Sequence, residues 1–271
     1  MIDNALKSFN NAQIVFDAKS EKKEIWETVK MSSFIYPELW VHRWLSLNIL
    51  CKLGYNFSMD IDKKELANFI VKTSHTVRDL PKTLNGLNLP GEDLSYAYLA
   101  NTDLSHADLC EASLFRANLY ESDLSDAKLP KAGLQESYLG HATLDKADLS
   151  DAVLADARLT DASLIEANLS GAFLHRSKIV DAHLERANLT NASLPDADLG
   201  GSTLTSANLY SADLSNAKLK NTNLSGADLR YANLRNANLT GADLSDGDLT
   251  HADLTDADLT GANLSGTKMR I

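Results

Sequence analysis

The sequence predicts a mainly β protein in which a solenoid of stacked coils follows an α-helical domain, and three observations support this. A leucine recurs at every fifth residue from Leu84 to Met269, and only Ile179 and Met269 take its place. Most of these residues follow, by two positions, an alanine or another small residue. The composition also changes near residue 80, because all three tryptophans lie before that point.

A period of five residues fits neither regular secondary structure. On an α-helix, residues five apart are rotated by about 500°, so the leucines would drift around the cylinder. On a straight strand they would alternate between the two faces, because successive side chains point in opposite directions. The leucines share one direction only if the chain turns a corner once in every five residues, which is typical of a solenoid whose units bury their apolar sides against their neighbours.

The repeating unit resembles a known family. The segments 107–111 (Ala-Asp-Leu-Cys-Glu), 227–231 (Ala-Asp-Leu-Arg-Tyr) and 262–266 (Ala-Asn-Leu-Ser-Gly) are similar to the A(D/N)LXX unit of pentapeptide repeat proteins. The resemblance covers residues 84–269 and implies a right-handed quadrilateral β-helix, in which four units form one square coil of twenty residues. It also implies that the leucine and the small residue point inward.

The length of the repeat region predicts a rod without loops. Its units make about nine coils, and a spacing of roughly 4.8 Å between coils gives a rod about 45 Å long. A single inserted residue would turn every later leucine outward. The unbroken phase is therefore itself a structural requirement.

Residues 1–80 are predicted to form a helical domain before the repeat domain, residues 81–271. Apolar residues at helical spacing indicate four helices. Pro37 and Gly54 would bound the third, and Asp62 with Glu65 resembles a capping box at the start of the fourth. The apolar positions of the four helices are, in order, Leu6, Phe9 and Phe16; Ile25, Trp26 and Val29; Trp40, Trp44, Leu47 and Cys51; and Leu66, Phe69, Ile70 and Thr73. This domain either caps the open end of the solenoid or acts as a separate recognition domain.

Charge and cysteine content also separate the two regions. Residues 1–80 hold 11 Lys or Arg and 10 Asp or Glu, whereas residues 81–271 hold 15 and 27, a net charge of −12. Cys51 and Cys110 lie in different regions, which favours free thiols in a reducing cytoplasm. The first residues lack the pattern of a signal peptide, and no apolar run is long enough to span a membrane.

The sequence predicts neither an enzyme nor a cofactor-binding protein. A core filled by leucine leaves no pocket where a nucleophile, a base and an orienting group could converge. The seven histidines show no ligand-type pairing, so no metal site is expected. The aspartates near the end of the chain match neither the EF-hand pattern nor the Gly-Gly-x-Gly-x-Asp repeat. No phosphate-binding loop or basic nucleic-acid patch is apparent.

The outward positions therefore carry the functional prediction. Residues twenty apart should lie on the same side of the coil, and large outward side chains are concentrated between residues 153 and 180. We expect Phe115 to lie on the same side as Val153 and Phe173. The candidate partner surface comprises Phe115, Val153, Ile165, Phe173, Val180, Tyr98, Tyr138, Arg158 and Lys178.

Three functions fit these features. The first is a non-enzymatic module that presents an acidic, rigid rod to a protein partner. The second follows from the resemblance: some pentapeptide repeat proteins mimic DNA, bind DNA gyrase and protect it from toxins or quinolones. Its candidate acidic surface comprises Asp243, Asp246, Asp248, Asp253, Asp256 and Asp258. The third is a secreted effector. The exposed last coil further predicts self-association as a homodimer through Leu264, Met269 and Ile271.

Overall fold

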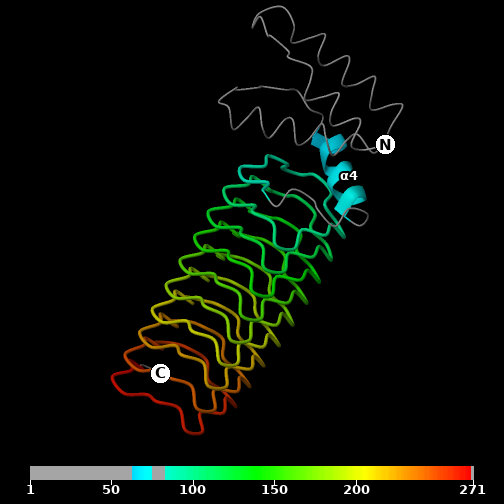
Figure 1. Ribbon diagram of the computed structural model, residues 1–271. Helices are drawn as coiled ribbons and strands as arrows, with labels where there is room; N and C mark the ends of the chain where they lie inside the picture. Colours follow the sequence, from blue (N-terminus) through cyan, green and yellow to red (C-terminus); the bar gives the residue numbers. More distant parts are fainter. Residues whose placement is uncertain (1–62, 75–82, 270–271) are drawn as a thin grey trace, which may run out of the picture. The chain divides into compact units, whose positions relative to one another are not determined.

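The computed structural model describes residues 63–74 and 83–269, and these form one helix followed by a continuous stack of coils (Figure 1). The three helices predicted before residue 60 lie outside the described residues. The fourth predicted helix is confirmed as α4, Lys63–Ser74. Its Ala67 and Ile70 are buried, and the Lys63 ammonium donates a 2.9 Å hydrogen bond to Asn88 Oδ1 in the first coil.

α4 belongs to the same compact unit as the coils. The chain divides into the units Met1–Asp60 and Ile61–Ile271, so the helix groups with the repeats. The sequence had instead placed this helix at the end of the N-terminal domain. The Lys63–Asn88 hydrogen bond is one contact that joins this helix to the coils.

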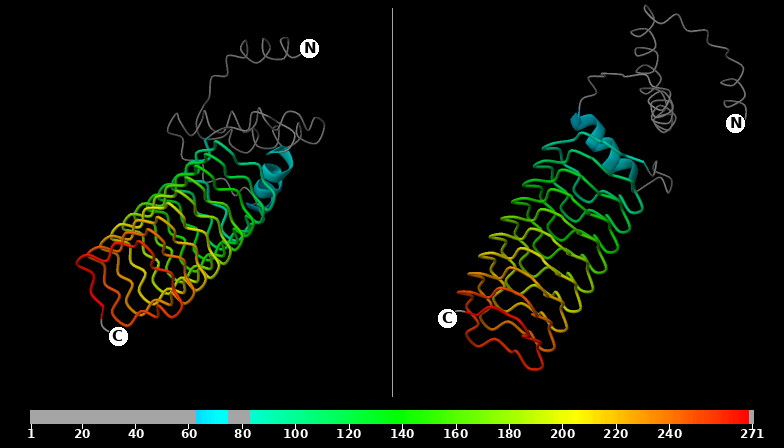
Figure 2. Two further views of the ribbon diagram at one scale, coloured as in Figure 1. Left: turned by 90° about the horizontal axis from the view of Figure 1, so that it is seen from below. Right: turned by 90° about the vertical axis from the view of Figure 1, so that its left-hand side faces the viewer.

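The coils have the predicted register of twenty residues. Parallel bridges join each outward residue to the residue twenty positions later, from Thr83↔Asp103 to Asp248↔Lys268. Each twenty-residue coil contains four short extended segments with a corner after each, so the solenoid is four-sided. Between residues 83 and 269 the pattern contains no helix and no looped-out residue, and Figure 2 shows the uninterrupted stack.

The backbone N–H groups of residues 94–97 all have acceptors, and they illustrate a unit that begins with Asp or Asn. The Leu94 N–H donates to Ser113 O at 2.7 Å and the Tyr96 N–H to Phe115 O at 2.8 Å, both in the next coil. The Ala97 N–H closes the corner on Leu94 O at 3.1 Å. The Ser95 N–H donates to Asp93 Oδ1 at 2.9 Å.

The remaining N–H of a unit belongs to its outward residue and points back to the previous coil. In the next coil, for example, Ser113 N–H donates to Glu92 O at 2.9 Å. In the A(D/N)LXX unit, the backbone offers no acceptor to the N–H of the residue that follows the leucine. The side chain of the Asp or Asn accepts this hydrogen bond instead. This explains why an oxygen-bearing side chain is frequent before the leucine.

The corners use a backbone conformation that the sequence pattern did not predict. Every fifth residue from 86 to 266 has a positive φ, and at 29 of these positions the residue is not glycine. One positive φ at the third residue of a closed four-residue turn is typical of type II turns. For a residue other than glycine this conformation costs about 1–2 kcal/mol. The inter-coil hydrogen bond that each corner N–H from Gly86 to Asp246 donates helps to offset that cost.

The core is a stack of leucines with a small residue beside each. From Leu89 to Leu244 the inward residue of every unit is at most 1% exposed, and so are nearly all alanines two positions earlier. Where serine or threonine replaces that alanine, its hydroxyl donates a hydrogen bond to a backbone carbonyl. Ser137 Oγ donates to Leu134 O and Ser177 Oγ donates to Leu174 O, both at 2.7 Å. The predicted inside and outside assignment is therefore confirmed.

Candidate interaction surface

Four of the predicted candidates, Tyr98, Tyr138, Arg158 and Lys178, lie in one straight column on one side of the solenoid, which we call the Tyr98 column. Bridges connect its consecutive members, and Asp198 and Lys218 continue it. Tyr98 is 51% exposed and Tyr138 is 43% exposed. The full set in chain order is Tyr98, Asn118, Tyr138, Arg158, Lys178, Asp198, Lys218, Asn238 and Asp258.

The apolar residues of the candidate partner surface lie at different positions around the coil. Val153 and Phe173 are bridged neighbours on the adjacent side, and Phe173 is 51% exposed. Phe115 does not share their side, because Ser113 occupies the outward position of that coil. Phe115 begins the next corner, and its ring contacts Tyr96 edge to face with 5.5 Å between centroids.

Two more apolar residues also start corners. Ile165 and Val180 each follow the inward residue of their unit, on different sides of the coil, and both are half-buried. The nine candidates therefore do not form one continuous patch. Sequence spacing assigns the side correctly only for outward bridge residues, because a corner residue is shared between two sides.

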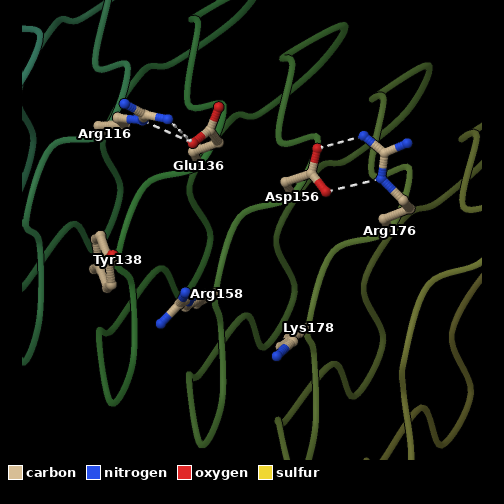
Figure 3. Close-up of a pocket in the computed structure, with 7 residues that line it drawn as sticks. All are labelled: Arg116, Glu136, Tyr138, Asp156, Arg158, Arg176 and Lys178. Carbon is tan, nitrogen blue, oxygen red and sulfur yellow. Dashed lines mark hydrogen bonds and ion pairs between the residues drawn. The ribbon is translucent and has the colours of Figure 1, made fainter.

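The Tyr98 column borders a groove of about 340 Å³ that the sequence did not predict (Figure 3). One row of the groove is the middle of the Tyr98 column, and the other consists of corner residues with positive φ. Figure 3 shows the two rows side by side across consecutive coils. The lining residues are Arg116, Glu136, Tyr138, Asp156, Arg158, Arg176 and Lys178.

The corner row is held by two ion pairs between residues twenty apart. Arg116 approaches Glu136 to 2.6 Å, and Arg176 holds Asp156 through two hydrogen bonds of 2.9 and 2.7 Å. The hydrogen bonds from Arg176 lower the pKa of Asp156, and Glu136 raises the pKa of Arg116. Each of the two carboxylates of the groove is therefore already paired with an arginine.

The other row carries two cations without such partners. The Arg158 guanidinium lies over the Tyr138 ring, 4.8 Å from its centroid. Within the described coils, neither Arg158 nor Lys178 has a carboxylate within 4.0 Å. The groove thus holds four cations and two carboxylates, which makes it locally basic on an acidic solenoid.

Comparison with known proteins identifies the solenoid. The family model for pentapeptide repeats matches residues 93–129 and overlapping segments that together span 132–270, with 8 copies. The chain is 35% identical to HetL, a pentapeptide repeat protein involved in heterocyst differentiation regulation from the cyanobacterium Nostoc. That match covers 68% of this chain and 88% of HetL, with a TM-score of 0.34. The chain belongs to the pentapeptide repeat family.

Two further solved structures are also similar to this pentapeptide repeat protein. It is 20% identical to QnrB1, a plasmid-mediated fluoroquinolone resistance protein, over 68% of this chain and 90% of QnrB1, with a TM-score of 0.35. It is 23% identical to Rfr23 from the cyanobacterium Cyanothece, over 73% of this chain and 99% of Rfr23, with a TM-score of 0.16. A search of curated proteins finds no match.

The predicted acidic residues of this pentapeptide repeat protein surround the coil. Asp243, Asp248, Asp253 and Asp258 each occupy the outward position of a different side. Asp246 and Asp256 occupy corners with positive φ. The six residues therefore form an acidic band around the solenoid and not one acidic face.

Four of these aspartates also close their own turns. Asp243, Asp248, Asp253 and Asp258 each accept a hydrogen bond of 2.9–3.0 Å from the N–H two residues later. Thr255 donates its hydroxyl to Asp253 as well. Side-chain hydrogen bonds from Ser245, Thr250, Thr255 and Thr260, followed by these backbone hydrogen bonds, lower the pKa of all four carboxyls, that of Asp253 to about 2.

The lowered pKa values predict a loss of stability in acid. A carboxyl whose pKa is lower in the folded state stabilises the fold above its unfolded pKa of about 3.9, and this contribution disappears as pH falls toward 2. We expect the melting temperature to fall between pH 4 and pH 2. Replacing Asp243, Asp248, Asp253 and Asp258 by asparagine should reduce that fall, because the amide oxygen remains an acceptor but does not titrate.

Thermal melts followed by circular dichroism at pH 7, 4, 3 and 2 measure both effects. The corresponding alanine variant is the control, because it removes the acceptor as well and should lower the melting temperature already at pH 7. An asparagine variant with the same acid dependence as the wild type would contradict this role of the aspartates.

The last described coil is more open than the others. Leu264 is 37% exposed and Met269 is 44% exposed. Ile271, the third residue predicted to take part in self-association, lies outside the described residues. Self-association through this coil stays a prediction, which sedimentation of the wild type and a Met269→Asp variant across a salt series would test.

Within residues 63–74 and 83–269, no group of three His, Cys, Asp or Glu side chains is placed to hold a metal ion. α4, the helix described, is too short and too polar to cross a membrane. Cys110 is a half-buried free thiol, and Cys51 lies outside this part of the chain.

Four groove residues were missing from the sequence prediction. Arg116, Glu136, Asp156 and Arg176 belong to a corner row, and no feature used in the sequence prediction pointed to these four residues. The sequence nevertheless contains a pattern that indicates these ion pairs, because Arg116 and Arg176 each have a carboxylate residue twenty positions away. In a four-sided coil this spacing places opposite charges in direct contact.

Proposed function

We propose that this pentapeptide repeat protein is a non-enzymatic interaction module that presents its rigid coils to a protein partner. The observation that carries the proposal is the pair of adjacent sides with large exposed side chains, Phe173 on one and Tyr98 and Tyr138 on the other. Exposed aromatic residues contribute strongly to protein interfaces, because they bury much area and lose little conformational entropy. Backbone hydrogen bonds between coils hold the segments that carry them.

Capture of a partner from the source cell tests this function. Full-length tagged protein should retain a partner that Phe173→Ser loses, because loss of the aromatic ring removes the largest apolar contact on that side. Asn233→Ser is the matched control, since Asn233 lies on the same side three coils further along. The captured protein should bind again when both proteins are purified. Failure of purified binding, or equal binding by Phe173→Ser, would contradict the proposed surface.

A second candidate function is binding to DNA gyrase, which the family resemblance implies and the acidic band favours. The lowered pKa values keep Asp243, Asp248, Asp253 and Asp258 ionised at neutral pH. An acidic rod of this kind could occupy a surface that normally receives the phosphates of DNA.

A supercoiling assay decides this second candidate. If the acidic band binds gyrase, the wild type should alter supercoiling at low salt, where charge effects are strongest. Replacing Asp243, Asp246, Asp253 and Asp256 with asparagine should abolish the effect while leaving the far-UV circular dichroism unchanged. The absence of gyrase binding by the wild type at low salt would exclude this candidate.

A further inference from the structure

We propose that the groove beside the Tyr98 column binds an acidic, extended peptide segment of the protein partner, with carboxylates against Arg158 and Lys178. The inference rests on the proposed interaction function and adds the chemistry of what is recognised. It depends on two cations that the solenoid leaves without counter-charges, on the fixed surroundings of these cations, and on the acidity of the rest of the solenoid.

Arg158 differs from the other arginines of the described coils. Those other five each have a carboxylate within 3.1 Å, namely Arg116, Arg176, Arg186, Arg230 and Arg235. The Arg158 guanidinium instead lies over the Tyr138 ring. Stacking on one face orients the guanidinium plane and leaves its N–H edge available for a bidentate hydrogen bond to a carboxylate.

Lys178 is the bridged neighbour of Arg158, one coil further along. The next residue of the column, Asp198, could have neutralised Lys178, but it pairs with Lys218 on its other side at 3.3 Å. Two like charges therefore stand directly opposite each other on neighbouring coils, which is unfavourable in the isolated protein. An acidic ligand would relieve this repulsion.

The surroundings of these cations are already fixed. The Arg176–Asp156 and Arg116–Glu136 pairs occupy the neighbouring row, so their carboxylates are engaged with arginines other than Arg158. The groove therefore keeps its excess of positive charge without a rearrangement of its own ion pairs. This is the property of a preorganised anion-binding surface.

The charge of the whole repeat domain favours a short acidic peptide over a nucleic acid. Residues 81–271 carry a net charge of −12, which repels a long polyanion. An extended peptide places alternate side chains on one face about 6.6–6.8 Å apart, whereas neighbouring coils are about 4.8 Å apart. The long side chains of Arg158 and Lys178 span this difference, so two alternating glutamates reach both cations.

Fluorescence anisotropy with a labelled Ser-Glu-Ser-Glu-Ser-Glu-Ser peptide tests the proposal on the full chain. At about 50 mM salt the wild type should bind this peptide and should not bind its glutamine counterpart. The double variant Arg158→Gln, Lys178→Gln should lose at least about tenfold in affinity. Arg158→Lys should lose affinity as well, because lysine keeps the charge but not the bidentate edge.

The control variant is Lys128→Gln, Lys131→Gln, which removes the same charge from exposed positions in other columns. It should change the affinity by less than about twofold. Equal losses in both double variants would overturn the proposal, because they would indicate a general charge effect. No binding by the wild type, or tighter binding of an oligothymidine of the same charge, would overturn it too.

The result remains separate from the test of the proposed function. If the peptide fails to bind while Phe173-dependent capture of a partner persists, only the groove proposal falls. If the peptide binds through Arg158 and Lys178 but no Phe173-dependent partner exists, the groove stands and the aromatic surface does not. Circular dichroism of each variant confirms that the coils are intact.

Discussion

Replacing Leu164 with aspartate should unfold the coils around it. Leu164 is 1% exposed and lies among the leucines of the preceding and following coils. Truncating a buried leucine alone costs about 2–5 kcal/mol, and a buried carboxylate without a partner adds to that cost. We expect a fall of the melting temperature by at least about 10 °C, because each kcal/mol corresponds to about 2–4 °C in a domain of this size.

Asn191→Asp is the matched control, since it also introduces an aspartate but at an exposed corner. Asn191 has a φ of 57°, a conformation that aspartate tolerates nearly as well as asparagine. Its melting temperature should stay within a few degrees of the wild type. Similar effects of Leu164→Asp and Asn191→Asp in thermal and urea denaturation would contradict the assignment of inward and outward positions.

Insertion of a single serine between Glu166 and Ala167 should have a comparably large effect. The corner there is closed by a 3.0 Å hydrogen bond from the Ala167 N–H to Leu164 O. The extra residue either breaks this corner or turns the following leucines outward. We expect a loss of several kcal/mol, measured as a lower melting temperature and as exposed apolar surface that binds a hydrophobic dye.

Insertions of five and twenty residues at the same place separate two requirements. Duplication of residues 147–166 adds one coil and keeps every leucine in phase, so the melting temperature should be preserved or raised. Inserting Ala-Asn-Leu-Ser-Gly also keeps the leucines inward, but it moves each later residue to the next side. That variant should fold while losing peptide binding, because Arg158 and Lys178 no longer share a column.

If the single insertion melts like the wild type, the solenoid loops out an extra residue without cost. An unbroken five-residue period of the leucines would then not be required for the solenoid to fold. Retention of peptide binding by the five-residue insertion would separately contradict the placement of the ligand on the Tyr98 column.

The sequence by itself determined the solenoid, its coil length and the direction of nearly every side chain in it. These follow from one physical fact, since a leucine at every fifth residue can be buried only if the chain turns once per unit. The same spacing placed Tyr98, Tyr138, Arg158 and Lys178 in one column, as the bridges between them confirm. The fourth helix was also predictable from its apolar spacing and capping residues.

Only the tertiary structure decided how the outward side chains use their positions. The periodicity places two residues beside each outward residue, one twenty positions earlier and one twenty positions later. It does not determine with which of the two an ion pair forms. Arg176 selects Asp156 over Asp196, and Asp198 selects Lys218 over Lys178. Rotamers and competition for the same acceptors set these choices, and they leave Arg158 and Lys178 unpaired.

The corners were the other feature that the sequence did not reveal. A positive φ is usually predicted from glycine, yet most corners here carry other residues, including Tyr96 and Arg116. Inter-coil hydrogen bonds formed only in the stacked structure offset that local cost. The same corners placed Phe115 away from Phe173 and created the row of ion pairs that borders the groove. Local preference and period determined the core, whereas contacts between coils determined the surface.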